Sequence, residues 1–145
     1  MTIEKFKFTD YAQIRLANGI GLEHWNLRGG VLPVLMAMEN GPFWTVRDGG
    51  EVLAIGGYWP LSKRVCEVSF FPSEKFVVKP LGVYRALRNS VNNLKDVFNR
   101  VQLNCRDEAC FVRFAKSLGF EEEGRMRGFG RDGIDHLMMS IVRQA

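Results

Sequence analysis

The chain has 145 residues, of which 46% are hydrophobic and 25% are charged, and its formal net charge is +4 at pH 7. This length and composition suit one domain, 1–145, with a core of its own, and they exclude extended disorder. The mild basic excess is compatible with an acidic partner or a phosphate-bearing ligand. The sequence has no dense run of Lys or Arg, so the net charge gives no specific indication of nucleic-acid binding.

The cysteines indicate neither disulfides nor a metal site. Cys66, Cys105 and Cys110 are odd in number, and both histidines of the chain are far from them in sequence. We expect three buried, reduced thiols in a cytosol-like compartment, that is, a cytoplasmic protein. The longest apolar run, 31–38, is too short to cross a bilayer.

The first sixty residues predict a strand, two helices and a hairpin. Alternation over 3–8 indicates a strand with one apolar side, and Asp10 with Gln13 resembles a capping box that opens a short helix. A second short helix is expected over 31–39. The turn 48–50 contains two glycines that accept positive φ, which predicts a hairpin of strands 43–47 and 51–59. Within the second of these strands, the pair Gly56-Gly57 suggests a bulge or a close backbone approach.

The rest of the chain is organised around the stretch 65–99. A strand over 65–71 turns at 72–74, and Pro80 suits the first turn of a long amphipathic helix. The apolar residues of this helix recur at steps of three or four: Leu81, Tyr84, Leu87, Val91, Leu94 and Phe98. A strand, a loop and a helix N-terminus in this order can receive an anion through backbone N–H groups, although many such junctions only connect two elements.

The last third predicts a strand over 101–105, a helix over 108–118 that ends at Gly119, and a hairpin of 121–129 with 134–143. Because a helix joins the strand 65–71 to the strand 101–105, these two strands should be parallel, with a right-handed crossover. The complete order is β-α-α-β-β-β-α-β-α-β-β. We therefore predict an α/β (α+β) domain with a mixed, mostly antiparallel central sheet that is flanked by helices.

Two segments carry a resemblance to a known family. The run 113–124, RFAKSLGFEEEG, resembles a last helix with a lysine-x-leucine-glycine-phenylalanine ending and an acidic strand after it, and 53–57, LAIGG, resembles a second hairpin strand. On these segments the chain resembles the GNAT superfamily of acyl-CoA-dependent N-acyltransferases, over nearly its full length. The resemblance implies the GNAT fold, acetyl-CoA or CoA as cofactor, and an amine as acyl acceptor.

More narrowly, the run 54–57, the long basic helix and the run 112–119 make the chain similar to the small GNAT-like internal virion proteins of short-tailed phages. That similarity implies a place in the host cell cytoplasm and in the virion, with phage virion or host proteins as partners. Two alternatives stay open. The chain is either an N-acetyltransferase with a degenerate cofactor motif, or a non-enzymatic virion protein that keeps the GNAT scaffold for interactions.

The cofactor motif is half present. Family members hold the acyl-CoA pyrophosphate with a basic or amide residue, two spacers, a glycine, a spacer and a small residue. Lys79 and Gly82 match this pattern, whereas Tyr84 replaces the small residue, and Pro80 has no N–H to donate. The Tyr84 ring either blocks the pyrophosphate or, as its helical spacing favours, points into the core. The resemblance implies these cofactor-binding residues: Phe70, Phe71, Lys79, Gly82, Val83, Tyr84, Asn104 and Phe111.

The catalytic residues are also only partly matched. The family's general acid is a tyrosine four residues before the last helix's glycine, where this chain has Ala115, so water or another group would have to protonate the leaving thiolate. The general base is usually a carboxylate on the central strand, and Glu67 is the first candidate and Glu74 the second. The alternative for Glu67 is an exposed strand residue that pairs with a nearby Lys or Arg.

Two further groups have simple interpretations. Asp135 and His136 are adjacent on a predicted strand, so their side chains should point to opposite faces and not act together. Arg125, Arg127 and Arg131 either contact an acidic protein or a nucleic acid, or form a charged sheet edge that discourages strand addition.

Overall fold

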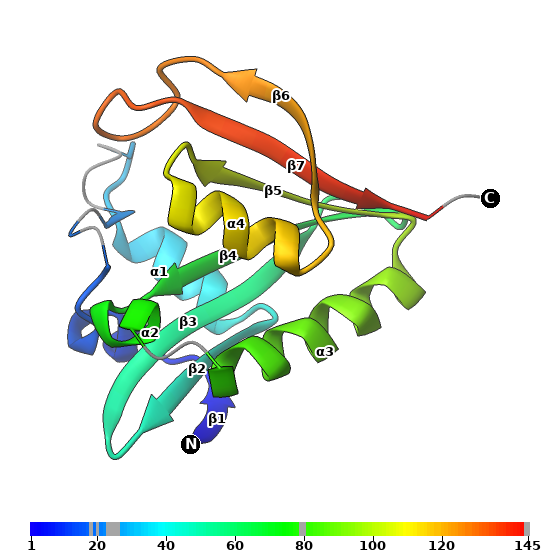
Figure 1. Cartoon of the computed structure of the whole chain (residues 1–145). Helices are drawn as coiled ribbons and strands as arrows, with labels where there is room; N and C mark the ends of the chain where they lie inside the picture. Colours follow the sequence, from blue (N-terminus) through cyan, green and yellow to red (C-terminus); the bar gives the residue numbers. More distant parts are fainter. Residues whose placement is uncertain (18, 20, 23–26, 79–80, 144–145) are drawn as a thin grey trace. The chain divides into compact units, whose positions relative to one another are not determined.

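The computed structural model describes residues 1–17, 19, 21–22, 27–78 and 81–143 (Figure 1). The strands form a seven-stranded sheet in the order β1-β2-β3-β4-β5-β7-β6. The pairs β1–β2, β2–β3, β5–β7 and β6–β7 are antiparallel, and β4–β5 is parallel. The predicted class, a mixed and mostly antiparallel sheet with helices, is confirmed. The chain divides into a first unit, Met1–Trp59 with Ser69–Tyr84, and a second unit, Pro60–Val68 with Arg85–Ala145.

The first unit contains the N-terminal strands and the short helices. Its elements are β1 (Thr2–Lys5), a 3₁₀ helix η1 (Phe8–Gln13), α1 (Leu32–Glu39), β2 (Phe43–Asp48), β3 (Glu51–Pro60, up to Trp59), the end of β4 (Val65–Pro72), α2 (Glu74–Val78) and the start of α3 (Leu81–Val97). Gly49 and Gly50 have φ of +57° and +85°, so the predicted hairpin is confirmed. Helix α2 was not predicted, and Lys79 and Pro80 lie outside the described residues.

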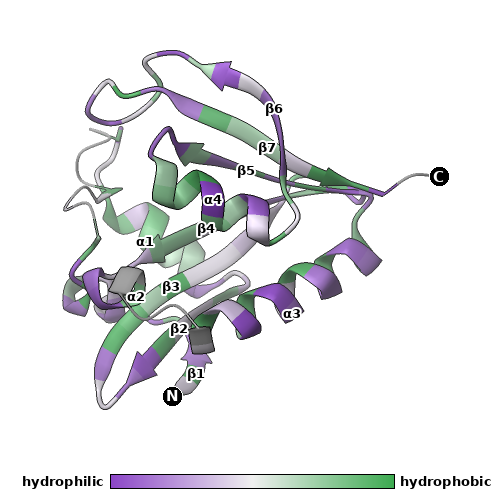
Figure 2. Cartoon of the chain, in the orientation of Figure 1, coloured by the Kyte–Doolittle hydropathy of each residue, from purple (hydrophilic) through white to green (hydrophobic). Residues whose placement is uncertain are grey.

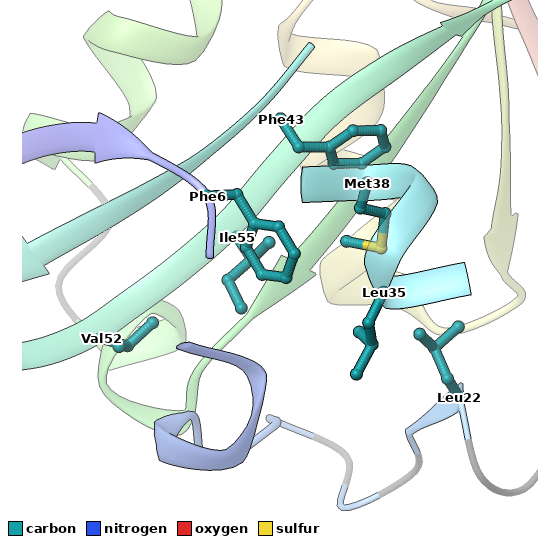
Figure 3. Packing of buried hydrophobic residues seen from close by; sticks show 7 residues of the cluster. All are labelled: Phe6, Leu22, Leu35, Met38, Phe43, Val52 and Ile55. Atoms are coloured by element: carbon teal, nitrogen blue, oxygen red, sulfur yellow. The ribbon is translucent and has the colours of Figure 1, made fainter. Parts of the chain in front are cut away.

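The core of the first unit joins α1 to the hairpin. Figure 3 shows its side chains, which come from the segment after β1, from α1, and from β2 and β3: Phe6, Leu22, Leu35, Met38, Phe43, Val52 and Ile55. The backbone of Gly57 lies so close to β2 that an added Cβ would overlap the Pro42 carbonyl oxygen and the Phe43 ring. The close approach predicted there is therefore confirmed, while the register shift of the hairpin lies between Val46 and Arg47.

The N-terminal predictions need two corrections. Strand β1 ends at Lys5 rather than at residue 8. Asp10 is not the N-cap but the third residue of η1, where its carboxylate accepts from the backbone of the N-cap residue Lys7. The reason is that the buried Asp10 carboxylate serves several donors. It accepts hydrogen bonds from Thr45 Oγ1 at 2.8 Å, from Arg47 Nη2 at 2.6 Å and from the Lys7 N–H at 3.0 Å. A paired charge can be buried, and this one ties η1 to β2.

The second unit is built around a parallel strand pair. Its elements are the first half of β4, α3 from Arg85 onward, β5 (Arg100–Arg106), α4 (Ala109–Ser117), β6 (Glu121–Met126) and β7 (His136–Val142). The parallel register of β4 with β5 confirms the predicted βαβ unit. Gly119 follows α4 with φ of +103°, as the predicted helix end requires. In Figure 2 the edge strand β6 is mainly hydrophilic, which discourages pairing with another sheet.

The cysteine prediction is wrong for one residue. Cys66 is buried and Cys105 is half-buried, and burial raises the pKa of each thiol to about 11. Cys110, by contrast, is exposed. It lies five positions before the buried Ala115 on α4, which places it about 140° around the helix from the buried side.

No helix in the described ranges is both long and apolar enough to cross a membrane.

Candidate functional site

The candidate site of the second unit begins where β4 and β5 part. Their ladder consists of three residue pairs, of which Glu67–Gln102 is the last. In the part of the chain that the structure describes, the next two residues, Val68 of β4 and Leu103 of β5, do not pair with each other. Strand β5 nevertheless continues along β7 as far as the pair Arg106–His136. Glu67 therefore lies at the point where β5 loses one of its two neighbours.

The Glu67 carboxylate is half-buried and has a neutral hydrogen-bond partner. Gln102 Nε2 donates to Glu67 Oε1 at 3.0 Å. The other end of the same amide, Gln102 Oε1, accepts from Arg100 Nε at 2.8 Å. The simple alternative, an exposed glutamate paired with a cation, does not describe this environment. Glu67 is half-buried, and the partner described for its carboxylate is an amide rather than a cation.

One face of β5 is polar throughout, which explains how these side chains meet. Successive strand residues point to opposite faces, so one set of alternate residues, Arg100, Gln102, Asn104 and Arg106, shares the face of Glu67. Asn104 continues the network, since its Oδ1 lies 2.8 Å from Nδ1 of the buried His136. Burial lowers the pKa of His136, and the charges of Arg106 and Arg131 lower it further. The ring is therefore neutral at pH 7.

A buried arginine closes the far end of this face. Arg106 is 7% exposed and makes a bidentate contact with Asp132, at 2.8 and 2.9 Å. It also donates to Glu108 Oε1 from two nitrogens, at 3.1 and 2.9 Å. The hydrogen bonds from Arg106 lower the pKa of Asp132 to about 2. This pairing anchors the β6–β7 loop to the end of β5.

Asp135 and His136 face apart, as predicted. Asp135 accepts from the Gly128 N–H at 2.9 Å and from Arg125 Nη1 at 3.2 Å, whereas His136 contacts Asn104. Arg125 also donates to Asp107 at 2.5 Å. Its charge is paired within the edge, which agrees with the charged-edge interpretation.

In the first unit, the predicted aromatic residues take part in packing. The Phe70 ring makes an edge contact with Phe76 at 5.2 Å between centroids, and Phe71 makes one with Tyr11 at 6.3 Å. Both phenylalanines are half-buried. Because they are consecutive residues of β4, their rings lie on opposite faces of the strand, and the ring of Phe71 packs against the core cluster.

The start of α3 presents an open backbone. Gly82 is exposed, and an added Cβ would meet only Met1, at 3.6 Å from Sδ and 3.7 Å from Cε. Such openness is what close approach of a phosphate to backbone N–H groups needs. Val83 is 2% exposed, so its side chain belongs to the interior, and Tyr84 is half-buried. Lys79, the basic residue of the motif, lies outside the described residues.

The remaining predicted residues are spread over other elements. Glu74 is exposed at the start of α2, where its backbone N–H donates to the Arg15 carbonyl at 2.9 Å. Phe111 is half-buried on α4, and Ala115, on the same helix, is buried. No hydroxyl stands at position 115, so this position supplies no proton donor.

Sequence reasoning missed the residues that surround Glu67. Gln102 and Arg100 were not considered, and neither was the buried Arg106. A signal was present in the sequence, because 100–106 alternates strictly between polar and apolar residues, although the strand predicted over 101–105 was expected to pair in parallel with 65–71. Strands of parallel pairs are usually apolar on both faces, so a wholly polar face indicates a role other than core packing.

Comparison with solved structures identifies the fold. The chain superposes on Ard1 from Thermoplasma volcanium with a TM-score of 0.75 and 20% identity, covering 99% of this chain and 98% of that one. For ribosomal-protein-alanine N-acetyltransferase from Brucella melitensis the TM-score is 0.72 with 17% identity, over 98% and 99%. For yncA from Salmonella typhimurium, solved with its cofactor acetyl-CoA, it is 0.70 with 18% identity, over 99% and 94%.

These likenesses span the chain, and they show that it has the GNAT fold, as the sequence resemblance implied. No protein-family model matches the sequence, and no curated protein matches it significantly.

Proposed function

We propose that the chain is an acyl-CoA-dependent N-acetyltransferase that acylates an amine. The observation that carries this proposal is Glu67, a half-buried carboxylate with a neutral partner, placed at the last rung of the parallel β4–β5 pair. The GNAT fold supports it, since one protein of that fold was solved with acetyl-CoA. The acceptor class is a primary amine that presents an N–H to this carboxylate.

The chain's residues fit acetyl-CoA in part. The open backbone at Gly82 suits a pyrophosphate, and we assign this role to Gly82, Val83 and Tyr84 at the start of α3, together with Lys79, the basic residue of the motif. The other proposed contacts with the ligand are Phe70, Phe71, Asn104 and Phe111. When bound, acetyl-CoA supplies the thioester carbonyl carbon that the amine attacks.

The chain's own chemistry is proton transfer. Glu67 accepts a proton from the acceptor. An ammonium gives this proton before attack, which frees the nitrogen lone pair, and a neutral amine gives it after the nitrogen has bonded to the thioester carbon and become positively charged. Glu74 is the weaker candidate for this role because it is exposed and lies on α2. Ala115 cannot donate a proton. We therefore propose that water provides the proton that a tyrosine gives in other members of the superfamily.

Isothermal titration calorimetry with acetyl-CoA tests the proposal. The wild type should release heat and gain thermal stability, while Gly82→Trp should lose both responses and keep its unliganded melting temperature, because the space beside Gly82 is open. Gly124→Trp is the matched control, since Gly124 is also exposed and has no atom near an added Cβ. No heat and no thermal shift for the wild type at millimolar acetyl-CoA would remove the proposal.

The second candidate is a non-enzymatic virion component that keeps the GNAT scaffold for interactions with phage or host proteins. Two observations favour it: Ala115 replaces the family's tyrosine, and Tyr84 replaces the small residue of the cofactor motif. A wild type that ignores acetyl-CoA, together with detection of the chain in purified particles by mass spectrometry, would establish it in place of the enzyme.

A further inference from the structure

We propose that Gln102 is a positioning residue for Glu67, and that Arg100 and Glu123 hold Gln102 in its working orientation. The inference rests on the proposed function, in which Glu67 is the general base. It extends that function to a network of side-chain hydrogen bonds that joins β4, β5, β7 and β6 within the second unit.

The first link is the direction of the Gln102 amide. Its Oε1 accepts from Arg100 Nε at 2.8 Å, and its Nε2 donates to Glu67 at 3.0 Å. The reversed amide would place NH₂ against a guanidinium and oxygen against a carboxylate, which are two repulsive contacts. Arg100 therefore decides that Gln102 presents a donor to Glu67.

The second link is the anchoring of Arg100. Its Nη1 contacts Glu123 Oε2 at 2.6 Å, a charge-assisted hydrogen bond. Glu123 also accepts from the hydroxyl of Ser140, a buried residue directly opposite Gln102 in the β5–β7 register. The hydrogen bonds from Ser140 and then Arg100 lower the pKa of Glu123, so it stays ionised and keeps its hold on Arg100.

The third link is a bulge in β6. Glu122 pairs with Met139 and Gly124 with Met138, so Glu123 is an extra residue in the strand. A bulge changes the direction of a side chain, and here it provides the carboxylate that reaches Arg100. The neighbouring Glu122 contacts Lys116 on α4 instead, at 3.3 Å. The interruption of the β6–β7 ladder at Glu123 therefore goes together with the contact of Glu123 with Arg100 on the polar face of β5.

The consequence for Glu67 is a fixed orientation. A donor whose own direction is fixed limits the rotamers of the carboxylate that it contacts. Proton transfer depends on such alignment, because a base must lie within hydrogen-bond reach of the proton that it removes. Gln102 acts through Glu67 and need not touch the acceptor.

The test measures kcat and KM of acetyl transfer to an amine panel, together with the ¹³C chemical shift of the Glu67 carboxyl carbon at pH 7, with Glu67→Gln for assignment. In Gln102→Leu we expect this resonance to move, because the carboxylate loses the donor that lies 3.0 Å away. We expect kcat to fall on the order of tenfold to a hundredfold, with KM for acetyl-CoA unchanged. Glu123→Gln should shift both readouts less, in the same direction, and Glu122→Gln is the matched control.

An unchanged Glu67 carboxyl resonance in Gln102→Leu overturns the inference, as does a change of equal size in Glu122→Gln. The NMR measurement needs no turnover, so it decides the coupling even for an inactive chain. Failure of the proposed function is seen separately, as a wild type without acetyl-CoA binding. If Gln102→Leu fails to fold, Glu123→Gln against Glu122→Gln decides the question.

Discussion

The guanidinium of Arg106 makes hydrogen bonds to two carboxylates in the second unit. It is 7% exposed, and every hydrogen bond described for its guanidinium goes to a carboxylate of Glu108 or Asp132. A buried cation is tolerated only when it is paired. Planar, bidentate geometry makes arginine better suited to this position than lysine. The contact joins the end of β5 to the β6–β7 loop, next to His136 and Asn104.

Asp132 gives a pH-dependent prediction at this scale. Arg106 lowers the pKa of Asp132 to about 2 in the folded chain, whereas an unfolded Asp has about 4. A lowered folded pKa contributes stability above about pH 4, and the contribution is lost as the pH falls through about 2. Asp132→Asn should therefore lower the melting temperature at pH 7 by several degrees, with a difference that shrinks between pH 4 and pH 2.

Thermal unfolding by circular dichroism at a series of pH values measures this difference. Asp48→Asn, at the exposed β2–β3 turn, is the control, and it should change the melting temperature little at any pH. If the melting temperature of Asp132→Asn were below that of the wild type by the same amount at every pH, the contact with Arg106 would not act through charge.

At the scale of elements, two strands depend on single residues that interrupt regular pairing. In β6 the bulge at Glu123 provides the carboxylate that contacts Arg100. In β3 the absence of a side chain at Gly57 permits close packing of the backbone against Pro42 and Phe43. The backbone of Gly57 lies against Pro42 and Phe43, and the Phe43 ring packs on Trp59 with 4.8 Å between centroids. This close approach lets the start of β2 meet β3 without a gap.

Gly57→Ala tests that packing. The new methyl group would overlap a carbonyl oxygen and a buried ring, so strands must shift, and we expect the free energy of unfolding to fall by about 2 kcal/mol. Gly124→Ala, where no atom lies near the added Cβ, should stay within about 0.5 kcal/mol of the wild type. Urea titration of both variants measures this. Equal effects would mean that conformational entropy, and not the contact, sets the cost.

At the scale of the whole molecule, β4 belongs to both compact units. Residues Val65–Val68 fall in the second unit, and Ser69–Pro72 fall in the first. Neither unit contains a complete strand β4, and neither is a continuous segment of chain. We propose on this ground that 1–145 is a single domain that folds as one cooperative unit.

Tryptophan fluorescence and helical ellipticity report on different units of the chain, so together they test this proposal. All three tryptophans, Trp25, Trp44 and Trp59, fall within the residue range of the first unit, whereas most of the long helix α3 and all of α4 belong to the second. Tryptophan fluorescence and ellipticity at 222 nm should therefore give the same urea midpoint. Two separate midpoints would show that the units unfold independently, and the single-domain proposal would then be wrong.

The sequence by itself determined the order and type of nearly every element, the β2–β3 hairpin, the parallel β4–β5 pair and the GNAT resemblance. The elements, the hairpin and the parallel pair follow from periodicity, glycine positions and connection lengths, which are properties of neighbouring residues, whereas the resemblance depends on the runs 53–57 and 113–124. The sequence placed the start of the first short helix at Asp10, whereas η1 begins at Phe8, and Asp10 is its third residue, where its carboxylate also accepts from Thr45 and Arg47.

The surroundings of Glu67 were decided only by the tertiary structure. Gln102 is 35 positions from Glu67, and Glu123 is 23 positions from Arg100, so no local pattern joins them. Strand register places Gln102 beside Glu67, and the bulge in β6 provides Glu123. Register and bulges depend on which strands pair, and strand pairing is determined only when the whole sheet has formed.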